Sequence, residues 1–133
     1  MYPRLFLIVG GAVLLLLGIV GYIGVFNETS TPWFWLDSGE NLAHTVLGVV
    51  ALAAVYVPGL NTALAPYYRA IVILVGVIAL FFAVYGFIQS GAAEPNTFGL
   101  ANLENPADNI LHLVVAIAAF GAAFMSSPEP AST

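Results

Sequence analysis

The sequence predicts an all-α membrane protein with four transmembrane helices, arranged as an up-down-up-down bundle of two tandem, parallel-related helical hairpins. Three observations lead to this fold class. Of the 133 residues, 61% are hydrophobic and only 7% are charged, whereas a soluble domain carries about 25% charged residues. Four apolar stretches are long enough to cross a membrane. The second half of the chain also repeats the pattern of the first half.

The four predicted spans are residues 5–26, 38–57, 70–88 and 106–125. Helices of about 20 residues match the ~30 Å hydrocarbon thickness of a bilayer, since each residue adds 1.5 Å. Continuous helices also pair every backbone group inside the segment, as lipid requires. The first span is too long for the core of an export signal, so we interpret it as a retained helix. Pro58 and Gly59 are predicted to end the second span, and residues 126–133 to form a short disordered tail.

Two copies of one hairpin, about 2–57 and 67–125, are predicted within a single transmembrane domain, residues 1–133. A shift of 65 residues pairs small residues of the first and third spans, namely Gly11, Gly18 and Gly21 with Gly76, Ala83 and Gly86. From the first long loop onward the shift becomes 68 and pairs polar residues, namely Asp37, Glu40, Asn41 and His44 with Asn105, Asp108, Asn109 and His112. Parallel repeats of this kind predict a pseudo-two-fold axis along the membrane normal.

Charge predicts the orientation and excludes several partners. The net charge of −5 provides no basic face, so no nucleic-acid partner is expected. Arg4 and Arg69 precede the first and third spans, on one side of the membrane, whereas the loops on the other side contain acidic residues and no Lys or Arg. The positive-inside rule then places both termini in the cytoplasm. The chain has no cysteine, which excludes disulfides and thiolate metal sites.

The paired motifs contain the only two histidines of the chain, His44 and His112, each four residues after an acid and so on the same helix face. A structural interpretation explains these motifs without a ligand. Asp37 with Glu40, and Asn105 with Asp108, have the spacing of capping boxes, with Pro106 as the first helical residue. Within the spans, Asn41 and Asn109 can hydrogen-bond between helices.

Two ligand-binding interpretations use the same residues. His44 and His112 on facing helices can be axial ligands of a haem, or of the magnesium of a chlorin. Together with Glu40 and Asp108, they also form a possible ligand set for zinc, iron or copper. The sequence leaves a structural role, a haem or chlorin, and a transition metal open as alternatives.

Both copies resemble one known family. A glycine-rich helix, a loop and Asn-x-x-His occur twice, and the second copy reads Asn-Pro-Ala-Asp-Asn-Ile-Leu-His-Leu from Asn105 to Leu113. This pattern is similar to a bacterial family of small four-helix membrane proteins that is described only as a domain of unknown function. The first copy departs from it, since Ser38 and Gly39 replace Pro-Ala and Thr45 follows His44. The resemblance implies a bacterial inner-membrane protein and no particular activity.

We therefore expect a non-enzymatic accessory or scaffold subunit, surrounded by the lipid bilayer and packed against other membrane-protein subunits. No base lies near a candidate nucleophile in the sequence, so no enzyme is expected. Proton relays and ion pathways use charges in the middle of spans, and here the charges lie at span ends. The alternatives are a haem-, chlorin- or metal-binding subunit with His44 and His112 as ligands, and a small-molecule channel or transporter.

Overall fold

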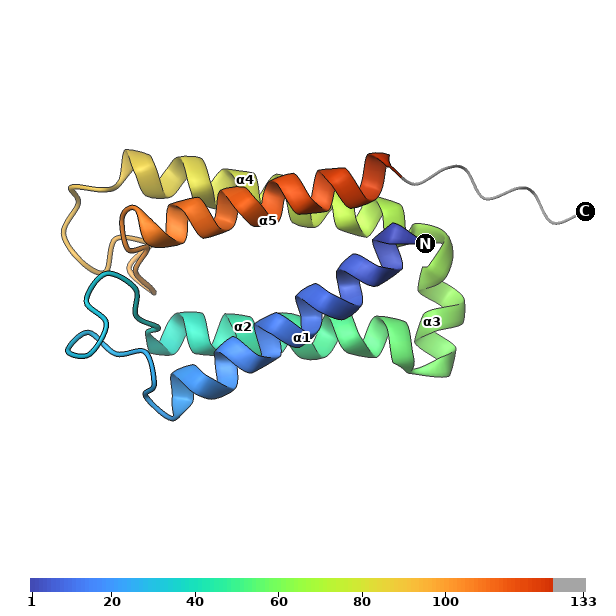
Figure 1. Cartoon of the computed structure of the whole chain (residues 1–133), viewed down its shortest axis with the longest axis horizontal. Coiled ribbons are helices and arrows are strands. Elements are labelled where there is room, and N and C mark those ends of the chain that lie inside the picture. Colours follow the sequence, from blue (N-terminus) through green and yellow to red (C-terminus); the bar gives the residue numbers. More distant parts are fainter. Residues whose placement is uncertain (126–133) are drawn as a thin grey trace, which may run out of the picture.

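The structure is a computed structural model that describes residues 1–125 (Figure 1), so the predicted tail, 126–133, lies outside the described residues. Apart from one isolated β-bridge between Thr97 and Ala101, the regular structure in this part of the chain is helical. The elements are α1 (Tyr2–Tyr22), α2 (Ser38–Tyr56), α3 (Pro58–Leu64), the 3-10 helix η1 (Ala65–Tyr67), α4 (Tyr68–Ile88) and α5 (Ala107–Phe124).

Four helices of the described chain are long and apolar enough to cross a membrane: α1, α2, α4, which ends the helical run Pro58–Ile88, and α5. Large apolar side chains are exposed on all four, and Leu16, Val50, Leu74 and Ile117 are each about 60% exposed. Exposure of such an apolar surface to water would cost free energy, whereas in a bilayer the acyl chains of the lipids cover it. The prediction of an all-α membrane protein with four transmembrane helices is confirmed.

The first span ends four residues earlier than expected. Residues 5–26 are predicted as the helix, but α1 covers Tyr2–Tyr22. Gly24 has a left-handed φ of +72°, and its N–H donates to the carbonyl of Gly21 at 3.0 Å. The N–H of Val25 donates to the carbonyl of Val20 at 3.1 Å. Together these bonds are a Schellman motif, which ends a helix.

The predicted stop at Pro58 and Gly59 is correct for α2, which ends at Tyr56, but the chain does not enter an irregular loop there. Pro58 is instead the first residue of α3, a short helix that the sequence analysis missed. Proline suits that position, since the first N–H of a helix has no partner inside the helix. Helices α3 and η1 connect α2 to α4 at one end of the bundle (Figure 1).

The spans pack in two close pairs, which we call hairpin one (α1 and α2) and hairpin two (α4 and α5). Small residues allow the close approach within each pair. A Cβ on Gly48 of α2 would lie 2.8 Å from the carbonyl oxygen of Gly11 of α1. In hairpin two, a Cβ on Gly76 would lie 2.9 Å from the Phe120 ring. Helices in lipid associate through such close approaches, because apolar burial alone gives them no advantage.

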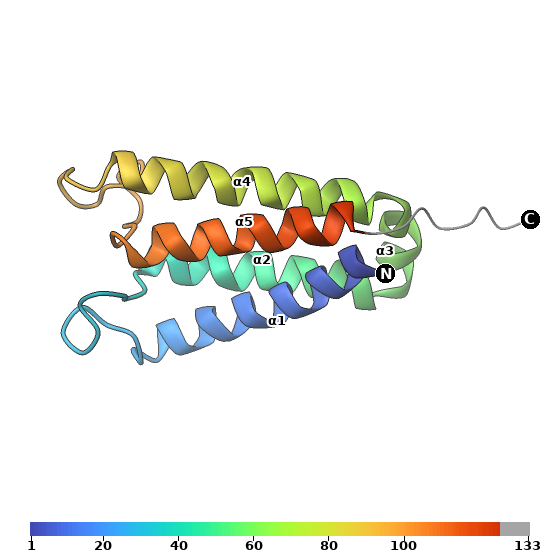
Figure 2. The same cartoon turned by 45° about the horizontal axis from the view of Figure 1, so that its top comes forward.

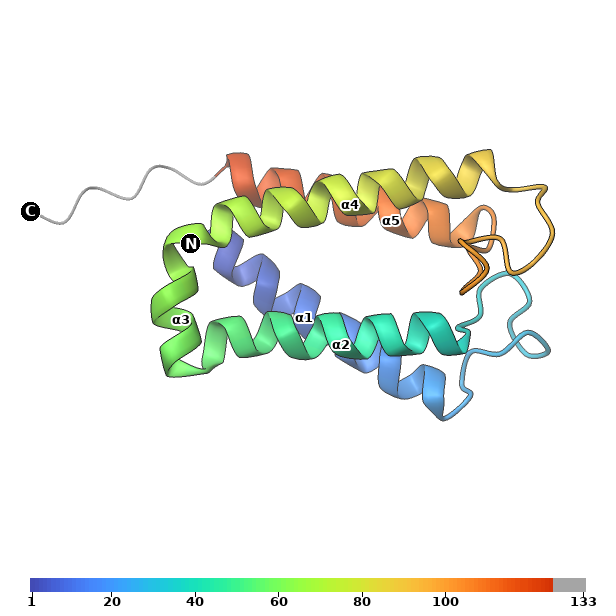
Figure 3. The same cartoon turned by 180° about the vertical axis from the view of Figure 1, so that it is seen from behind.

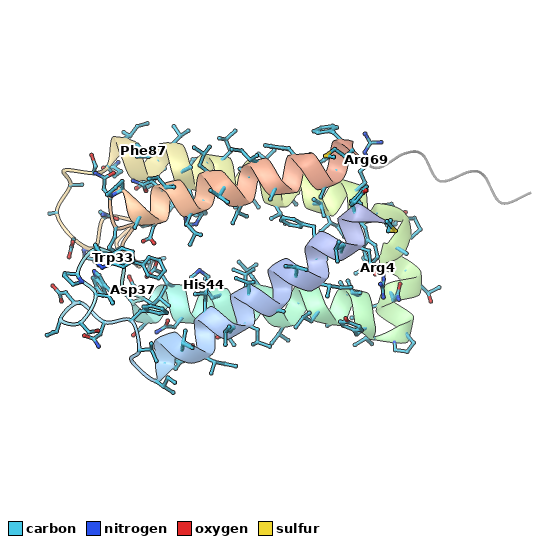
Figure 4. The ribbon with its side chains drawn as sticks, in the orientation of Figure 1. Arg4, Trp33, Asp37, His44, Arg69 and Phe87 are labelled. Carbon is cyan, nitrogen blue, oxygen red and sulfur yellow. The ribbon has the colours of Figure 1, made fainter. Side chains whose placement is uncertain are left out.

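The two hairpins meet differently at the two ends of the bundle. We call the end with the N-terminus and α3 the Arg end, since Arg4 and Arg69 lie there, and the end with loops 23–37 and 89–106 the loop end (Figure 4). Helix α1 runs obliquely, so that it approaches hairpin two at the Arg end and leaves it toward the loop end (Figures 1 and 3). The buried apolar cluster at the Arg end comprises Leu7, Val55, Tyr68, Val72, Ala119 and Ala123.

At the loop end the polar motifs of α2 and α5 begin, beside the two long loops. Figures 1 and 2 show that α2 and α5 both start at this end. The fold therefore brings the first turns of α2 and α5 to the same end of the bundle as both loops. Among the residues gathered there are all four candidate ligands from the sequence, His44, His112, Glu40 and Asp108.

Candidate functional site

The candidate residues are distributed over α2, α5 and the second loop. Glu40 and His44 lie in the first two turns of α2, and Asp108 and His112 in those of α5. Figure 4 shows His44 on the side of α2 that faces hairpin two. Asp37 precedes α2 at the same end.

The start of α2 is held by a capping box. Oδ1 of Asp37 accepts a hydrogen bond from the N–H of Glu40 at 2.9 Å, and Oε2 of Glu40 accepts one from the N–H of Asp37 at 2.9 Å. Oδ2 of Asp37 also accepts from the N–H of Asn102, in the second loop, at 2.6 Å. Asp37 therefore satisfies an orphan N–H of its own helix and joins the two hairpins.

The matching capping box predicted for α5 is wrong. The N-cap is Pro106 rather than Asn105, the first helical residue is Ala107, and no side chain caps the helix. Because α5 starts one residue later than the repeat predicts, Asp108 is the second helical residue, where a capping box needs the third. Oδ2 of Asp108 instead accepts from the N–H of Glu104, at 2.8 Å. Oδ1 of Asn105 accepts from Nδ2 of Asn109, at 2.9 Å.

Glu104 is the residue of this site that the sequence analysis missed. One oxygen each from Glu40, Glu104 and Asp108 lie within 4.8 Å of one another. Glu40 is 9% and Asp108 2% exposed. Both carboxyl oxygens of Glu104 are buried and accept no N–H hydrogen bond within residues 1–125. The carboxyl of Asp108 lies beside them, where a shared proton would join the two groups. The sequence did contain a sign of its role, since the predicted repeat pairs Glu104 with Leu36, a buried apolar residue.

The second loop positions Glu104 through a pair of asparagines. Nδ2 of Asn96 donates to the carbonyl of Leu103 at 3.2 Å, and its Oδ1 accepts from the N–H of Leu103 at 2.9 Å. Oδ1 of Asn102 accepts from the N–H of Asn96 at 3.2 Å. Both backbone groups of Leu103, its N–H and its carbonyl, are therefore hydrogen-bonded to Asn96, which fixes the backbone next to Glu104.

Electrostatics make this carboxyl cluster, defined as Glu40, Glu104 and Asp108, unusual. The two basic residues of the chain, Arg4 and Arg69, lie at the opposite end of the bundle (Figure 4). Burial raises the pKa of Glu104 well above its ordinary value, and the neighbouring carboxyls of Asp108 and Glu40 raise it further. Buried carboxylates normally have a cationic partner or bind a metal, and the cluster has no Lys or Arg beside it.

The two histidines lie one helical turn deeper than the acids of their own helices. Nδ1 of His112 lies 2.8 Å from the carbonyl oxygen of Asp108, which favours the tautomer with the proton on Nδ1 and leaves Nε2 with a lone pair. The Phe82 ring packs beside this imidazole, with centroids 5.7 Å apart. Nδ1 of His44 is buried and has no hydrogen-bond partner among residues 1–125. Neither imidazole belongs to the group of atoms within 4.8 Å.

Asn41 and Asn109 do not use their side-chain oxygens for the hydrogen bonds between helices that the sequence suggested. Both Oδ1 atoms are buried, and neither accepts a hydrogen bond within the part of the chain that the structure describes. Each oxygen instead lies against a glycine of the partner helix, where a Cβ on Gly21 or Gly86 would overlap it. Both hairpins make this same contact.

Residues 4–125 match the family described as Domain of unknown function (DUF4383). The chain belongs to this family. The resemblance to a family of unknown function is thus confirmed over nearly the whole described chain, and DUF4383 as described assigns no activity to the carboxyl cluster or to the histidines. No curated protein and no solved structure matches the chain.

Proposed function

We propose that this DUF4383 protein is a non-enzymatic membrane protein that binds a divalent cation at the loop end, through Glu40, Glu104 and Asp108. The observation that supports the proposal is the burial of three carboxyl groups within 4.8 Å without a basic side chain beside them. Three such groups cannot all stay charged in a buried position without a cation, and in its absence protons neutralise some of them. The buried oxygens of Glu104 accept no N–H hydrogen bond within residues 1–125, which supports a cation as the compensating charge.

The ligand type and spacing favour a hard cation. Calcium takes six to eight oxygen ligands at about 2.3–2.6 Å, and two oxygens bound to one ion can then be up to about 5 Å apart. The 4.8 Å limit within which the cluster oxygens lie fits this requirement without a change of fold. Manganese accepts both carboxylate and imidazole ligands, so His44 or His112 can bind directly or hold water ligands beside the carboxyls.

Calorimetric titration of metal-depleted protein in mild detergent with Ca²⁺, Mn²⁺, Mg²⁺ and Zn²⁺ tests the proposal. We expect one cation per chain for Ca²⁺ or Mn²⁺, and at least tenfold weaker binding in Glu104→Gln. Glu94→Gln is the matched control, since Glu94 is an exposed acid of the same loop. Equal heats in both variants, or none with any of the four cations, would refute the proposal.

A second candidate, a haem or chlorin held by His44 and His112, has support in the unpartnered Nδ1 of His44 and the oriented ring of His112. It predicts a visible absorption band in protein purified from its native membrane. The band should vanish in His44→Ala or His112→Ala. A colourless preparation from haem- and chlorin-replete cells would eliminate this candidate.

For the location we propose the bacterial inner membrane with both termini in the cytoplasm. Arg4 and Arg69 at one end support this orientation by the positive-inside rule, and it places the carboxyl cluster on the periplasmic side. The chain has no cysteine, so single Thr29→Cys and Thr62→Cys variants report the two sides. An impermeant maleimide should label Thr29→Cys in intact cells and Thr62→Cys only after lysis, and the reverse pattern would invert the orientation.

The two hairpins, about 2–57 and 67–125, are proposed to be copies of one repeat. The equivalent contacts of Asn41 with Gly21 and of Asn109 with Gly86 support this proposal. As the wider role we propose an accessory subunit of a larger membrane assembly, since large apolar side chains are exposed on all four spans and can pack against other subunits. Recovery of stoichiometric partner subunits in mild detergent supports that role, and a monodisperse free monomer opposes it.

A further inference from the structure

An apolar groove lies at the loop end, between the first loop and α5. Its volume is about 450 Å³, which is in the range of ligand-binding pockets. One wall is formed by aromatic rings of the first loop, where the Phe34 ring lies 5.4 Å from that of Phe26 and 6.0 Å from that of Trp33. The other wall is one face of α5, formed by Ala107, Ile110, Leu111 and Val114. Both walls are therefore apolar, and they come from different hairpins.

The groove extends from the membrane surface into the hydrocarbon region. Val114 lies seven residues after Ala107, the first residue of α5, so this wall is about 10 Å long. Trp33 lies at the loop end and is 68% exposed (Figure 4), and tryptophan side chains favour the depth of the lipid head groups. Ile110, Val114 and the next exposed residue, Ile117, are at least half exposed. The groove is thus continuous with the lipid-facing surface, and an acyl chain can enter it without leaving the bilayer.

A polar pocket of about 400 Å³ adjoins the groove, because Phe26 lines both. It lies where α1 ends, at Tyr22, and where α2 begins, at Ser38, which is the depth of the lipid head groups. Its charged lining residues are both acids, Glu28 and Asp37. The two arginines lie at the opposite end of the bundle (Figure 4). The charge of the pocket therefore favours a positively charged ligand group.

Aromatic rings and an amide oxygen favour an ammonium group in the polar pocket. Rings of Tyr22, Phe26 and Trp35 line the pocket, and the face of an aromatic ring attracts a cation. Asn41 also lines it, is 5% exposed, and has a side-chain oxygen that accepts no hydrogen bond within residues 1–125. A primary ammonium group has three N–H donors and no acceptor, which matches carboxylate and amide oxygens.

We propose that the loop end binds one phospholipid with a primary amine in its head group, with an acyl chain in the apolar groove and the ammonium group in the polar pocket. A second copy of the chain fits less well, because two copies side by side in one orientation would bring their acidic loop ends together. An anionic phospholipid is disfavoured by the same acids. The site goes beyond the proposed cation binding, since Glu40, Glu104 and Asp108 line neither the groove nor the pocket.

Fluorescence quenching by brominated lipids tests the proposal, because the two tryptophans of the chain line this site, Trp33 in the groove and Trp35 in the polar pocket. The protein is reconstituted in phosphatidylcholine, whose head group has no N–H. A minor fraction of phosphatidylethanolamine or of phosphatidylglycerol is added, with the same brominated acyl chains. Random contact gives equal quenching by both lipids. We expect phosphatidylethanolamine to quench at least twofold more strongly.

Two variants, each with a matched control, locate the site. Ala107→Phe should fill the groove and remove the excess quenching, whereas Ala118→Phe should keep it, since Ala118 is an exposed alanine of α5 outside the groove. Glu28→Gln should reduce the preference for phosphatidylethanolamine, and Glu94→Gln should not. Both acids are exposed, so this second pair tests the site without disturbing the packing of the helices.

Equal quenching by the two lipids in the unmodified protein would overturn the proposal. An excess that survives both Ala107→Phe and Glu28→Gln would also overturn it, because the lipid would then bind elsewhere. Single-molecule photobleaching in the same bilayers counts the chains in each particle. Dimers without excess quenching would assign the groove to a second copy in place of a lipid.

Discussion

Oδ1 of Asn109 lies against Gly86, in the space that a Cβ on that glycine would fill. Asn109 is fully buried, and its amide nitrogen is already bonded to Asn105. The contact therefore fixes how closely α4 and α5 approach at the loop end. It also fixes the rotation of α5 about its own axis, and in this rotation the carboxyl of Asp108 lies close to those of Glu40 and Glu104.

Gly86→Ala should destabilise the protein by about 1–3 kcal/mol, the usual cost of overpacking a close contact. Gly121→Ala is the control on the neighbouring helix, since no atom of the described residues lies within 4 Å of the position that its Cβ would take. This control should be neutral or stabilising by up to about 1 kcal/mol, because alanine favours helix over glycine. Reversible unfolding in detergent measures both, and equal stabilities would mean that Asn109 does not pack as described.

Asp37→Ala should cost about 2–4 kcal/mol, since it removes both an N-cap and the acceptor for the buried N–H of Asn102. Asp37→Ser should cost clearly less, because serine still caps α2 although it cannot also reach Asn102. Unfolding free energies and the hydrogen-exchange rate of the Asn102 amide measure the two effects. Fast exchange of this amide in the unmodified protein would contradict the bond between the hairpins.

Without divalent cations, the stability of the protein should fall as pH rises above the ordinary carboxyl pKa. Burial, and next the carboxyl of Asp108, raise the pKa of Glu104 above 4.5, so the folded state holds the proton more tightly than the unfolded chain. The stabilisation from this group is complete below the ordinary value and is lost as pH rises through the raised pKa. Unfolding in chelator at several pH values should show the fall, and Glu104→Gln should reduce it. An identical pH profile for this variant would exclude Glu104 as its source.

Calcium should stabilise the unmodified protein and not Glu104→Gln. At a concentration one hundred times the dissociation constant, a ligand that binds only the folded state adds about 2.7 kcal/mol. In chelator, Glu104→Gln should be the more stable of the two, since it removes one buried acid and the repulsion that goes with it. Thermal unfolding with Ca²⁺ and with chelator measures both the stabilisation by calcium and the stability difference between the two proteins in chelator. Glu94→Gln is the control. A calcium effect of equal size in Glu104→Gln would place the stabilising ion elsewhere.

Most of the fold was predictable because lipid imposes a simple rule, that apolar runs of about 20 residues become helices. The predictions were wrong where local backbone geometry, and not hydropathy, determines at which residue a helix begins or ends. Gly24 ends α1 inside an apolar run, which hydropathy does not reveal, and Pro58 begins α3 although it also ends α2. In α5 the capping box fails because the helix starts one residue later than the repeat implies.

The candidate site was predicted in part. The repeat identified Glu40 and Asp108, which do lie together, and the histidines, which lie beside them outside the closest group. Glu104 was missed since it belongs to a loop, and its position depends on bonds from Asn96 to Leu103 that no periodicity predicts. An acid at a repeat position occupied by buried Leu36 in the other copy was the available sign.

The central claim is that a cation binds among Glu40, Glu104 and Asp108, and anomalous diffraction from crystals grown with Mn²⁺ tests it most directly. We predict one anomalous peak at the loop end, within about 2.6 Å of oxygens from these carboxyl groups. The peak should be absent from crystals of Glu104→Gln and present in those of Glu94→Gln. A well-ordered cluster without a peak, in which the carboxyl groups pair with one another through shared protons, would contradict the claim.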